Sequence, residues 1–160
     1  MTVVKKNPSD LFVWPKEGVS RVPYQVYMDS EIYEREMEKL FRGSTWNYIG
    51  LEVEIPNPGD YKTTYVGDVP VVVTRDSAGS IHAFVNRCAH RGATVCMDPC
   101  GNSKTFTCVY HAWVYDAKGD LKGVPFKNGV NGQGGMPEGF DTSKLSLQKL
   151  KVDTYLGIIF

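Results

Sequence analysis

Two short clusters of cysteine and histidine are the residues of this chain whose types and spacing point most directly to chemistry. One residue separates Cys88 from His90, and two residues separate Cys108 from His111. Residues 91–107 lie between the two clusters. Thiolate and neutral imidazole are both ligands of transition metals. The two clusters therefore predict one metal site with two sulfur and two nitrogen donors.

This donor set is typical of a Rieske [2Fe-2S] centre, in which two cysteines bind one iron and two histidines bind the other. Two ferric ions, two sulfides, two thiolates and two neutral imidazoles carry no net charge, whereas an all-cysteine cluster is negative before reduction. Rieske potentials accordingly lie at roughly −150 to +300 mV, against about −400 mV for plant-type ferredoxins. The chemistry expected of Cys88, His90, Cys108 and His111 is the transfer of single electrons.

A zinc site is the main alternative for the same four residues. Cysteine and histidine in two closely spaced pairs also suit tetrahedral zinc. Zinc knuckles usually have two or more residues between the ligands of both pairs, and the single residue between Cys88 and His90 is unusual for them. The spacing favours the iron–sulfur cluster over zinc.

The residues around the ligands resemble the cluster loops of aromatic ring-hydroxylating dioxygenases, specifically of their large (alpha) subunits. The stretches that carry this resemblance are residues 86–92 and 108–113. In respiratory-chain Rieske proteins a disulfide ties the two loops together, and the places of its cysteines hold Ala93 and Tyr110 here. The lack of these two cysteines agrees with a reducing compartment, and we expect the protein to be cytoplasmic.

The resemblance extends along most of the chain, through residues 46–52, 55–60, 119–126 and 134–137. These stretches are similar to large subunits that act on aromatic carboxylates, such as the terephthalate, salicylate and anthranilate oxygenases. The resemblance implies hydroxylation of an aromatic carboxylate with molecular oxygen, and electrons from an NAD(P)H-dependent flavin/iron–sulfur reductase or a ferredoxin. It identifies neither the ring substrate, nor mono- against dioxygenation, nor the presence of a beta subunit.

The family also implies how electrons would leave the cluster. Its large subunits form trimers, and electrons cross from the histidine side of the cluster to the mononuclear iron of a neighbouring alpha subunit. On this chain the resemblance assigns the exit to His90 and His111, which we expect to lie outward of Cys88 and Cys108. A polypeptide of this length alone could be monomeric.

The number of histidines limits what this polypeptide can do by itself. Oxygen activation in the family takes place at a mononuclear Fe(II) held by two histidines and a carboxylate. The chain has three histidines, and only His82 is left once the cluster is supplied. We therefore expect no catalytic residue and no turnover within residues 1–160. The apolar run at 152–160 has no polar tail, and we expect a catalytic domain to follow it in a longer protein.

Residue types near the ligands predict a low reduction potential. A hydroxyl that donates to a cluster sulfur raises the potential. High-potential Rieske proteins carry a serine five residues after the second cysteine, where this chain has Trp113. We therefore expect a potential near the negative end of the Rieske range. Trp113 is expected to pack beneath the loop, and Tyr110 and Tyr115 are expected to be structural.

Five further residues match no ligand position. Cys96 and Cys100 could form a second metal pair or a disulfide, but bystander thiols are the simpler interpretation, and their exposure would allow dimers to form on oxidation. His82 is expected to be an exposed strand residue. Arg87 and Arg91 flank the first ligand pair. Solvation or an ion pair explains them as well as orientation of the loops or docking of an acidic partner.

The composition indicates a globular domain in water. Hydrophobic residues make up 42% and charged residues 22% of the chain, which are ordinary fractions, and the formal net charge is zero. No basic stripe indicates nucleic acid, and the first residues lack the apolar core of a secretory signal. No apolar run is long enough to span a membrane. We expect neither nucleic acid nor a membrane as a partner.

The sequence predicts a mainly β fold, with a Rieske [2Fe-2S] antiparallel β domain at residues 46–160 and an N-terminal arm with one helix at residues 1–45. The helix is expected at 30–42, where apolar residues repeat on one face. Asp29 or the residue after it can cap its start, and Gly43 can end it.

Strands are expected where β-branched and aromatic runs are bounded by glycine, proline or aspartate, at 46–51, 61–66, 69–74, 81–85, 105–107, 145–152 and 155–160. Turns are expected at 67–68, 77–79 and 116–119. The ligand pairs follow the strands at 81–85 and 105–107. We expect both pairs at hairpin tips, where loops can wrap a cluster on a rigid sheet. The glycine-rich stretch at 128–139 is expected to be a mobile or partner-facing excursion.

Three functions compete at this point. The chain could be the Rieske domain of an oxygenase large subunit, a freestanding Rieske ferredoxin that only carries electrons, or a zinc-binding interaction module. The predicted helical arm and the unfinished final strand argue against the ferredoxin. The ligand spacing argues against zinc.

Overall fold

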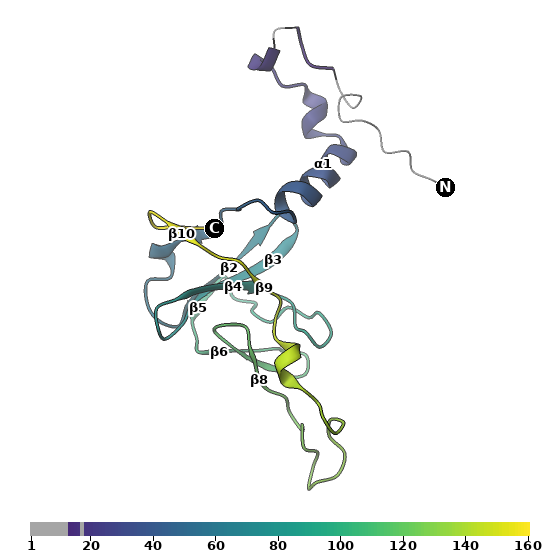
Figure 1. Cartoon of the computed structure of the whole chain (residues 1–160), viewed down its shortest axis with the longest axis vertical. Helices are drawn as coiled ribbons and strands as arrows, with labels where there is room; N and C mark the ends of the chain where they lie inside the picture. The colour runs from purple at the N-terminus through teal and green to yellow at the C-terminus, as the bar shows by residue number, and fades with distance from the viewer. Residues whose placement is uncertain (1–12, 17) are drawn as a thin grey trace, which may run out of the picture. The chain divides into compact units, whose positions relative to one another are not determined.

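The structure is a computed structural model that describes residues 13–16 and 18–160 (Figure 1). The chain divides into two compact units, residues 1–45 and 46–160. Every strand found in the described residues belongs to the second unit. In this described part of the chain, no helix combines the length and the apolar character needed to cross a bilayer.

The first unit is helical in its described part. Its elements are η2 (Gly18–Ser20), η3 (Tyr24–Tyr27), α1 (Ser30–Glu36) and the π-helix η4 (Met37–Phe41). Helix α1 begins after Asp29, whose Oδ1 accepts hydrogen bonds from the backbone N–H groups of Glu31 at 2.9 Å and Ile32 at 3.1 Å. The cap predicted from the sequence is thus Asp29.

The predicted helix at 30–42 changes its hydrogen-bond pattern before it ends. Its last turn is the π-helix η4, in which the Arg42 N–H donates to the Met37 carbonyl at 2.8 Å. Gly43 does not have the positive φ expected of a glycine that ends a helix. A Cβ at Gly43 would lie 2.1 Å from the Lys39 carbonyl oxygen. Glycine is needed there because the chain passes close to the helix end.

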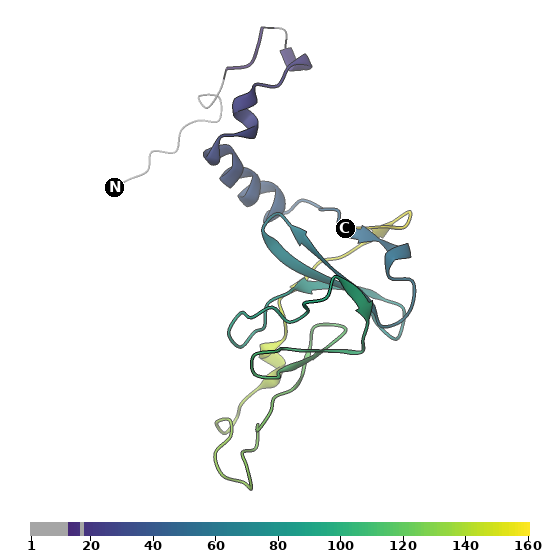
Figure 2. The same ribbon diagram turned by 180° about the vertical axis from the view of Figure 1, so that it is seen from behind.

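The second unit consists of three antiparallel sheets, which confirms the predicted mainly β fold (Figures 1 and 2). In sheet order the strands are β1 (Gly50–Leu51), β11 (Ile158–Ile159) and β10 (Thr154–Tyr155); β5 (Cys100–Asn102), β2 (Asp60–Val66), β3 (Val69–Arg75), β4 (Ile81–Val85) and β9 (Lys149–Leu150); and β6 (Thr105–Thr107), β7 (Val114–Asp116) and β8 (Leu121–Gly123). Two short 3-10 helices, η5 (Glu52–Glu54) and η6 (Thr142–Leu145), lie between strands.

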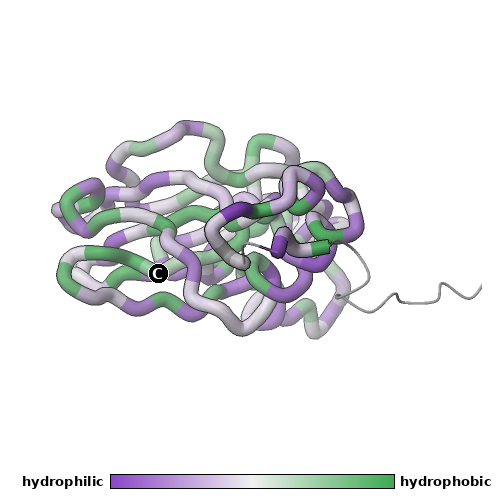
Figure 3. Tube along the Cα trace, turned by 90° about the horizontal axis from the view of Figure 1, so that it is seen from above, coloured by the Kyte–Doolittle hydropathy of each residue, from purple (hydrophilic) through white to green (hydrophobic). Residues whose placement is uncertain are grey.

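The five-stranded sheet has an apolar core on each face because alternate residues of β3 point to opposite sides. Val71 and Val73 belong to one core, together with Ile159 of the C-terminal hairpin. Val72 and its cross-strand partner Phe84 belong to the other core. Figure 3 shows hydrophobic (green) and hydrophilic (purple) segments alternating along the tube.

The β6–β7–β8 sheet packs against the second of these cores. Phe106 of β6 places its ring edge-on to Phe84 at 5.9 Å and edge-on to Tyr61 at 5.2 Å between ring centroids. Cys88 and Cys108 are buried in this same core. The two cysteines predicted to bind a metal therefore lie where the five-stranded sheet packs against the β6–β7–β8 sheet.

Two hairpin turns have the same hydrogen bonds around the side chain of an aspartate. Between β3 and β4, Asp76 Oδ1 accepts hydrogen bonds from the backbone N–H groups of Ala78 and Ser80, both at 2.9 Å. Gly79 supplies the positive φ of this turn, 85°. A short polar side chain that bonds the backbone two residues on is a common turn former.

The turn between β7 and β8 repeats these contacts. Asp116 Oδ1 accepts from the N–H groups of Lys118 and Asp120, both at 2.9 Å, and Gly119 has a φ of 77°. The sequence predicted both turns, at 77–79 and at 116–119. It could not show that the same side-chain bonds build them.

These two turns also contact each other. The Thr74 hydroxyl donates to the Ala117 carbonyl at 2.5 Å, and Lys118 Nζ lies 3.4 Å from Asp76 Oδ2. Since β4 runs away from its turn and β7 runs toward its own, the segments with the candidate ligands are at the opposite ends of these strands. The junction of the two turns is therefore one strand length away from the candidate metal centre.

Several strand boundaries differ from prediction. Strands β4 and β6 have the predicted bounds, but the run at 155–160 is a hairpin rather than one strand, with positive φ at Leu156 (49°) and Gly157 (82°). Of the residues predicted at 145–152, only Lys149–Leu150 form a strand. Of those at 46–51, only Gly50–Leu51 do. Strand β5, which was not predicted, has no β-branched residue.

The glycine-rich stretch at 128–139 extends away from the sheets in both ribbon views (Figures 1 and 2). It is nevertheless internally bonded, because Val130 and Gln133 form a β-bridge. A Cβ at Gly129 would lie 2.2 Å from the Gln133 carbonyl oxygen, so this close approach requires glycine. The Met136 N–H donates to the Lys127 carbonyl at 2.9 Å and closes the excursion.

Candidate metal centre

The two segments that carry the candidate ligands have the same backbone turn. In the first, the Cys88 N–H donates to the Ala93 carbonyl at 2.7 Å, and the Gly92 N–H donates to the Cys88 carbonyl at 2.8 Å. In the second, the Cys108 N–H donates to the Trp113 carbonyl at 2.8 Å, and the Ala112 N–H donates to the Cys108 carbonyl at 2.9 Å. We call these segments, residues 88–93 and 108–113, the first and second ligand loops.

Both ligand loops need one residue in the left-handed region. Gly92 has a φ of 72° in the first loop and Ala112 a φ of 54° in the second. Alanine pays a steric penalty in this conformation that glycine does not. The second loop therefore carries local strain that the first does not.

The expected placement at hairpin tips is right for one ligand loop only. The second loop joins β6 to β7, which pair with each other. The first loop follows β4, but the next strand, β5, pairs with β2. The first ligand pair consequently lies on a connection between non-adjacent strands. The spacing of the strands along the sequence did not show this.

The four candidate ligands differ in how far their side chains are exposed to solvent. Cys88 and Cys108 are buried, with 4% and 2% of their surface exposed. His90 and His111 are exposed. The two imidazole rings meet edge to face, with centroids 4.6 Å apart and planes at 71°. The side chains thus have the arrangement expected from the sequence, with sulfur donors inside and nitrogen donors at the surface.

A hollow of about 480 Å³ opens beside the two histidines. Its walls are mostly apolar and come from one residue of the first ligand loop, from the second ligand loop and from the stretch after β8; they are His90, Val109, Tyr110, His111, Ala112, Trp113, Pro125, Phe126 and Met136. Val109 and Phe126 are more than 70% exposed. The histidine side of the site is therefore an apolar surface.

The electrostatic surroundings favour neutral imidazole at the second ligand loop. Desolvation lowers the pKa of His111, and the neighbouring His90 and the Arg91 guanidinium lower it further. Neutral imidazole is the form that binds a metal. Arg91 and Arg87 are themselves exposed.

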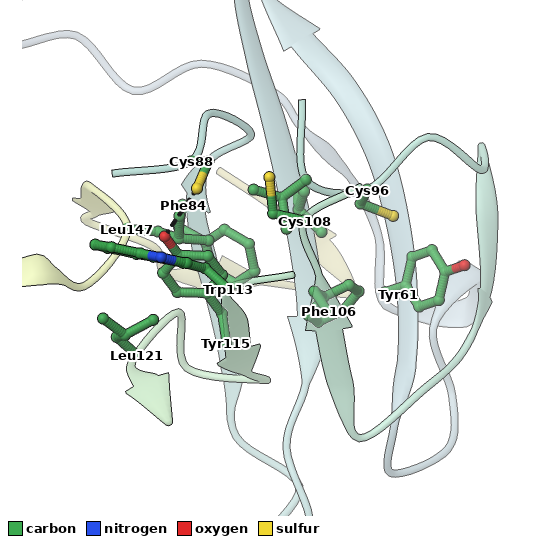
Figure 4. Close-up of a cluster of buried hydrophobic side chains, with 12 residues drawn as sticks. Tyr61, Phe84, Cys88, Cys96, Phe106, Cys108, Trp113, Tyr115, Leu121 and Leu147 are labelled. Carbon is green, nitrogen blue, oxygen red and sulfur yellow. Dashed lines mark hydrogen bonds between the residues drawn. The ribbon is translucent and has the colours of Figure 1, made fainter. Parts of the chain in front are cut away.

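Tyr115 was expected to be structural, but the structure brings its hydroxyl to a candidate ligand. The Tyr115 Oη lies 3.1 Å from Cys88 Sγ (Figure 4). It also accepts a hydrogen bond from the Ala89 N–H at 3.2 Å. Because Oη accepts from Ala89, its own proton is available to the sulfur. Burial and the contact with Cys88 raise the pKa of Tyr115, so the hydroxyl keeps this proton.

The hydroxyl of Tyr115 was not predicted as a donor, because a donor to sulfur was considered only at the position that Trp113 occupies. The available signal was the period of two in the strand that follows the second ligand loop. Trp113 and Tyr115 are both buried, with exposures of 4% and 0%, whereas Val114 between them is only half-buried. Alternate residues of a strand share a face, so a buried Trp113 places Tyr115 on the same side.

Trp113 packs beneath the loop, as predicted, and it also contacts a candidate ligand. Its indole ring stacks on the His90 imidazole, with centroids 4.8 Å apart and planes at 10°. The Phe140 ring lies edge-on to the indole at 6.3 Å. Tyr110 is 59% exposed, and the centroid of its ring lies 3.9 Å from the centroid of the His111 ring.

Asn86 holds the chain behind the first ligand loop. Its Oδ1 accepts from the N–H groups of Val95 at 3.1 Å and Cys96 at 2.9 Å, and its Nδ2 donates to the Cys96 carbonyl at 2.7 Å. Asn86 is one of few buried polar residues in the described chain, and these bonds satisfy both ends of its amide. It stands two residues before Cys88 and fixes how the chain enters the loop.

The two remaining cysteines differ from what the sequence suggested. Cys96 is buried, so the expectation that both thiols are exposed is wrong for this residue. Burial raises the pKa of Cys96, which keeps the thiol protonated. Cys100 is exposed on β5. No disulfide links the four cysteines, which are all free thiols.

His82 is not brought to the candidate centre. It is half-buried rather than exposed, and its Nε2 lies 2.9 Å from Asp76 Oδ2. The hydrogen bond with His82 is the largest cause that lowers the pKa of Asp76 to about 2. His82 therefore serves the turn between β3 and β4.

The donor chemistry of the four candidate residues fits a [2Fe-2S] cluster. In the part of the chain that the structure describes, no group of three or more His, Cys, Asp or Glu side chains is placed to hold a single metal ion. A cluster of two irons needs only two protein donors at each iron, because bridging sulfides complete the coordination. Two thiols and two imidazoles on matching loops supply these donors.

Comparisons with known proteins agree with this site. Residues 45–134 match the family model described as Rieske [2Fe-2S] domain. The chain is 54% identical over 147 residues to the anthranilate 1,2-dioxygenase large subunit of Burkholderia cepacia, covering 92% of this chain and 35% of that protein. It is 46% identical over 147 residues to the terephthalate 1,2-dioxygenase terminal oxygenase component subunit alpha 2 of Comamonas sp., covering 92% and 36%.

A solved structure gives the same result. The fold matches naphthalene 1,2-dioxygenase from Rhodococcus sp. bound to indole with a TM-score of 0.77 and 34% identity. This match covers 86% of the present chain and 30% of that one. The chain thus spans about a third of the length of the relatives that it matches.

Proposed function

Because this chain belongs to the Rieske [2Fe-2S] domain family, we propose that Cys88 and Cys108 bind one iron of the cluster and His90 and His111 bind the other. The observation that carries this proposal is the pair of matching ligand loops, which bury the two thiols and expose the two imidazoles. When bound, the cluster accepts one electron and passes it on.

The chain's own residues prepare the site for this transfer. The Tyr115 hydroxyl, 3.1 Å from Cys88 Sγ, stabilises negative charge on that sulfur. The apolar core around Cys88 and Cys108 keeps water from the thiolates. His90 and His111 remain accessible, so electrons leave on the imidazole side. The hollow beside them offers an apolar surface on which a redox partner can dock.

The contact between the Tyr115 hydroxyl and Cys88 Sγ changes the reduction potential that we expect for the cluster. Trp113 in place of serine removes one donor to sulfur, but Tyr115 provides another that the sequence prediction left out. We therefore propose a potential in the lower part of the Rieske range rather than at its negative end.

We further propose that the chain works in the terminal oxygenase component of an aromatic ring-hydroxylating system. The relatives that support this are oxygenase large subunits that align over 92% of the chain. In this role it receives electrons from an NAD(P)H-dependent reductase or a ferredoxin and delivers them to a mononuclear iron of a neighbouring alpha subunit. The three histidines of the chain do not supply that iron site.

Aromatic carboxylates are the proposed substrate class. The support is the 54% and 46% identity to proteins named for anthranilate and terephthalate. The similarity to these relatives is what assigns the substrate class.

Anaerobic reconstitution tests the ligand assignment. We expect two irons and two acid-labile sulfides per chain, a brown colour, and a paramagnetic signal after dithionite is added. One zinc per chain and no sulfide would instead support the zinc-binding alternative. Reduction of the loaded chain by NADH only when a matching reductase is present would support the electron-transfer role.

The oxygenase proposal needs a second experiment. The encoding gene is read past the codon of Phe160 for two histidines and a carboxylate residue that could bind iron. The protein that the gene encodes is then assayed with anthranilate, terephthalate and salicylate against benzene. Consumption of oxygen with the carboxylates is expected. If the reading frame ends without these residues, the freestanding ferredoxin becomes the better interpretation.

A further inference from the structure

We propose that Trp113 is a positioning residue for His90: its indole ring, stacked on the imidazole, fixes the plane in which His90 presents its nitrogen to iron. This inference rests on the proposed function, because it assumes that His90 is a cluster ligand. It assigns to the buried tryptophan a role beyond packing.

The geometry that supports this role is a parallel stack. The two ring planes differ by only 10°, and their centroids are 4.8 Å apart. His90 is exposed, so solvent alone would leave its ring free to rotate about its side-chain bonds. Trp113 is 4% exposed and is held by the core around it. The fixed indole ring of Trp113 thus supports the imidazole ring of His90, which would otherwise be mobile.

The same residue connects the two ligand loops. The Trp113 carbonyl accepts the hydrogen bond of the Cys108 N–H at 2.8 Å, within the second loop. Its side chain reaches the first loop at His90. The position of His90 is therefore set relative to the backbone of Cys108, which carries a candidate ligand of the other pair.

A second aromatic residue makes a corresponding contact with the sulfur donor of the first loop. Tyr115 contacts Cys88 Sγ, and Trp113 contacts the His90 ring. Trp113 is the last residue of the second ligand loop, directly before β7, and Tyr115 lies in β7; both are buried. This short segment thus supports both candidate donors of the first loop through two side chains.

His111 lacks equivalent support. Besides the edge-on imidazole of His90, the aromatic ring beside His111 belongs to Tyr110, which is 59% exposed and tilted by 30°. Tyr110 is the preceding residue in the same loop, so it moves with His111 and cannot fix it to another element. The structure therefore assigns His90 as the firmly oriented imidazole of the pair.

Replacing Trp113 tests this assignment. In the reduced, cluster-loaded chain, each ligand nitrogen gives its own hyperfine coupling in pulsed electron paramagnetic resonance. Trp113→Leu should change or broaden one of the two nitrogen couplings and leave the other. It should also release iron to a chelator about two- to tenfold faster, as expected for loss of a stacked aromatic pair. Trp113→Phe keeps a ring and should stay close to the wild type.

Two matched variants separate orientation from packing. Phe140→Leu removes a ring that contacts Trp113 but has no ring contact with His90, and it should leave both couplings unchanged. Tyr110→Leu removes the Tyr110 ring beside His111. It should not change the nitrogen hyperfine coupling that Trp113→Leu alters. If Trp113→Leu gives the couplings and the iron release of the wild type, or if Phe140→Leu reproduces its effect, the inference is wrong.

The wild-type chain provides a test that needs no folded variant at position 113. In the metal-free protein with labelled histidine, protons on carbon of the His90 ring should be shifted upfield by the indole ring current, and those of His82 should not. His90→Gln identifies the signal by its loss. Unshifted His90 protons would overturn the stack itself. A wild-type chain that binds no iron and sulfide would instead refute the proposed function.

Discussion

Tyr115 Oη lies 3.1 Å from Cys88 Sγ, and this contact joins the strand after the second ligand loop to the first ligand loop. The two residues are 27 positions apart in the sequence. A hydrogen bond to a thiolate sulfur is stronger when the sulfur carries more negative charge. The contact therefore favours the reduced cluster and bears directly on its potential.

Tyr115→Phe should lower the reduction potential of the loaded chain by about 50 mV, equivalent to roughly 1 kcal/mol for one electron. Spectroelectrochemical titration measures the change. Tyr65→Phe removes the same hydroxyl from an exposed residue of β2 and is the matched control. An equal potential in wild type and Tyr115→Phe would show that the hydroxyl does not donate to the sulfur.

His111→Cys should lower the potential by about 100 mV or more, because a thiolate adds negative charge and all-cysteine clusters lie near −400 mV. The iron and sulfide content is measured beside the potential, since the variant must still hold the cluster. His82→Cys places the same side chain on β4, away from the candidate centre, and should leave the potential unchanged. A potential that does not move in His111→Cys would contradict the ligand assignment.

The left-handed residues of the ligand loops should respond in opposite ways to exchange of glycine and alanine. Gly92→Ala should lower the free energy of unfolding by about 1 kcal/mol, although no atom lies within 4 Å of the added Cβ. Ala112→Gly should leave it equal or raise it by up to about 1 kcal/mol, since relief of strain exceeds or balances the entropy of glycine. Urea unfolding of the metal-free chain measures both. A loss of more than about 1 kcal/mol in Ala112→Gly would contradict the strain at that position.

Asp76 should make stability depend on pH in the acid range. Its pKa is lowered from 3.8 to about 2 in the folded chain, first by the hydrogen bond with His82. A carboxyl with a depressed folded pKa contributes stability that is present above its unfolded pKa and is lost as pH falls through about 2. The loss should be about 2 kcal/mol between pH 4.5 and 2.

Asp76→Asn should remove this acid dependence in urea titrations of the metal-free chain at several pH values. Asp98→Asn makes the same change at an exposed residue and serves as the control. If wild type and Asp76→Asn lose stability in parallel as the pH is lowered, another carboxyl dominates the acid response.

The thiols outside the ligand set should differ in reactivity in the loaded chain. Cys100 is exposed, whereas Cys96 is buried and its pKa is raised by burial. Alkylation at neutral pH should therefore modify Cys100 at least tenfold faster than Cys96, because the reactive species is an accessible thiolate. Mass spectrometry follows the modification. Cys100→Ser should abolish the fast phase, and Cys96→Ser should leave it.

The sequence predicts the strands best where local residues alone decide the structure. The bounds of β4 and β6 agree with prediction because short apolar or β-branched runs are followed directly by the cysteine loops. The turns at Asp76 and Asp116 were recognisable because aspartate and glycine bond and bend the chain locally. The pairing of β5 with β2 was not recognisable, since Cys100–Asn102 carry no strand signal of their own.

The candidate site shows the same limit. Cys88, His90, Cys108 and His111 are named by spacing, but the contact from Tyr115 to Cys88 depends on how β7 packs against the first ligand loop. The final run was misread because a leucine, Leu156, takes the positive φ of a hairpin turn. Nothing in an apolar run of residues reveals such a conformation before the pairing of β10 and β11 is known.

The junction of the two aspartate turns connects β4 and β7 at the ends that lie away from the ligand loops. There the Thr74 hydroxyl bonds the Ala117 carbonyl, and Lys118 pairs with Asp76. We expect substitutions at this junction to change how firmly the two strands, and the ligand loops beyond them, are held relative to each other. For protein engineers, the junction is a place from which cofactor retention can be adjusted while Cys88, His90, Cys108 and His111 are left unchanged.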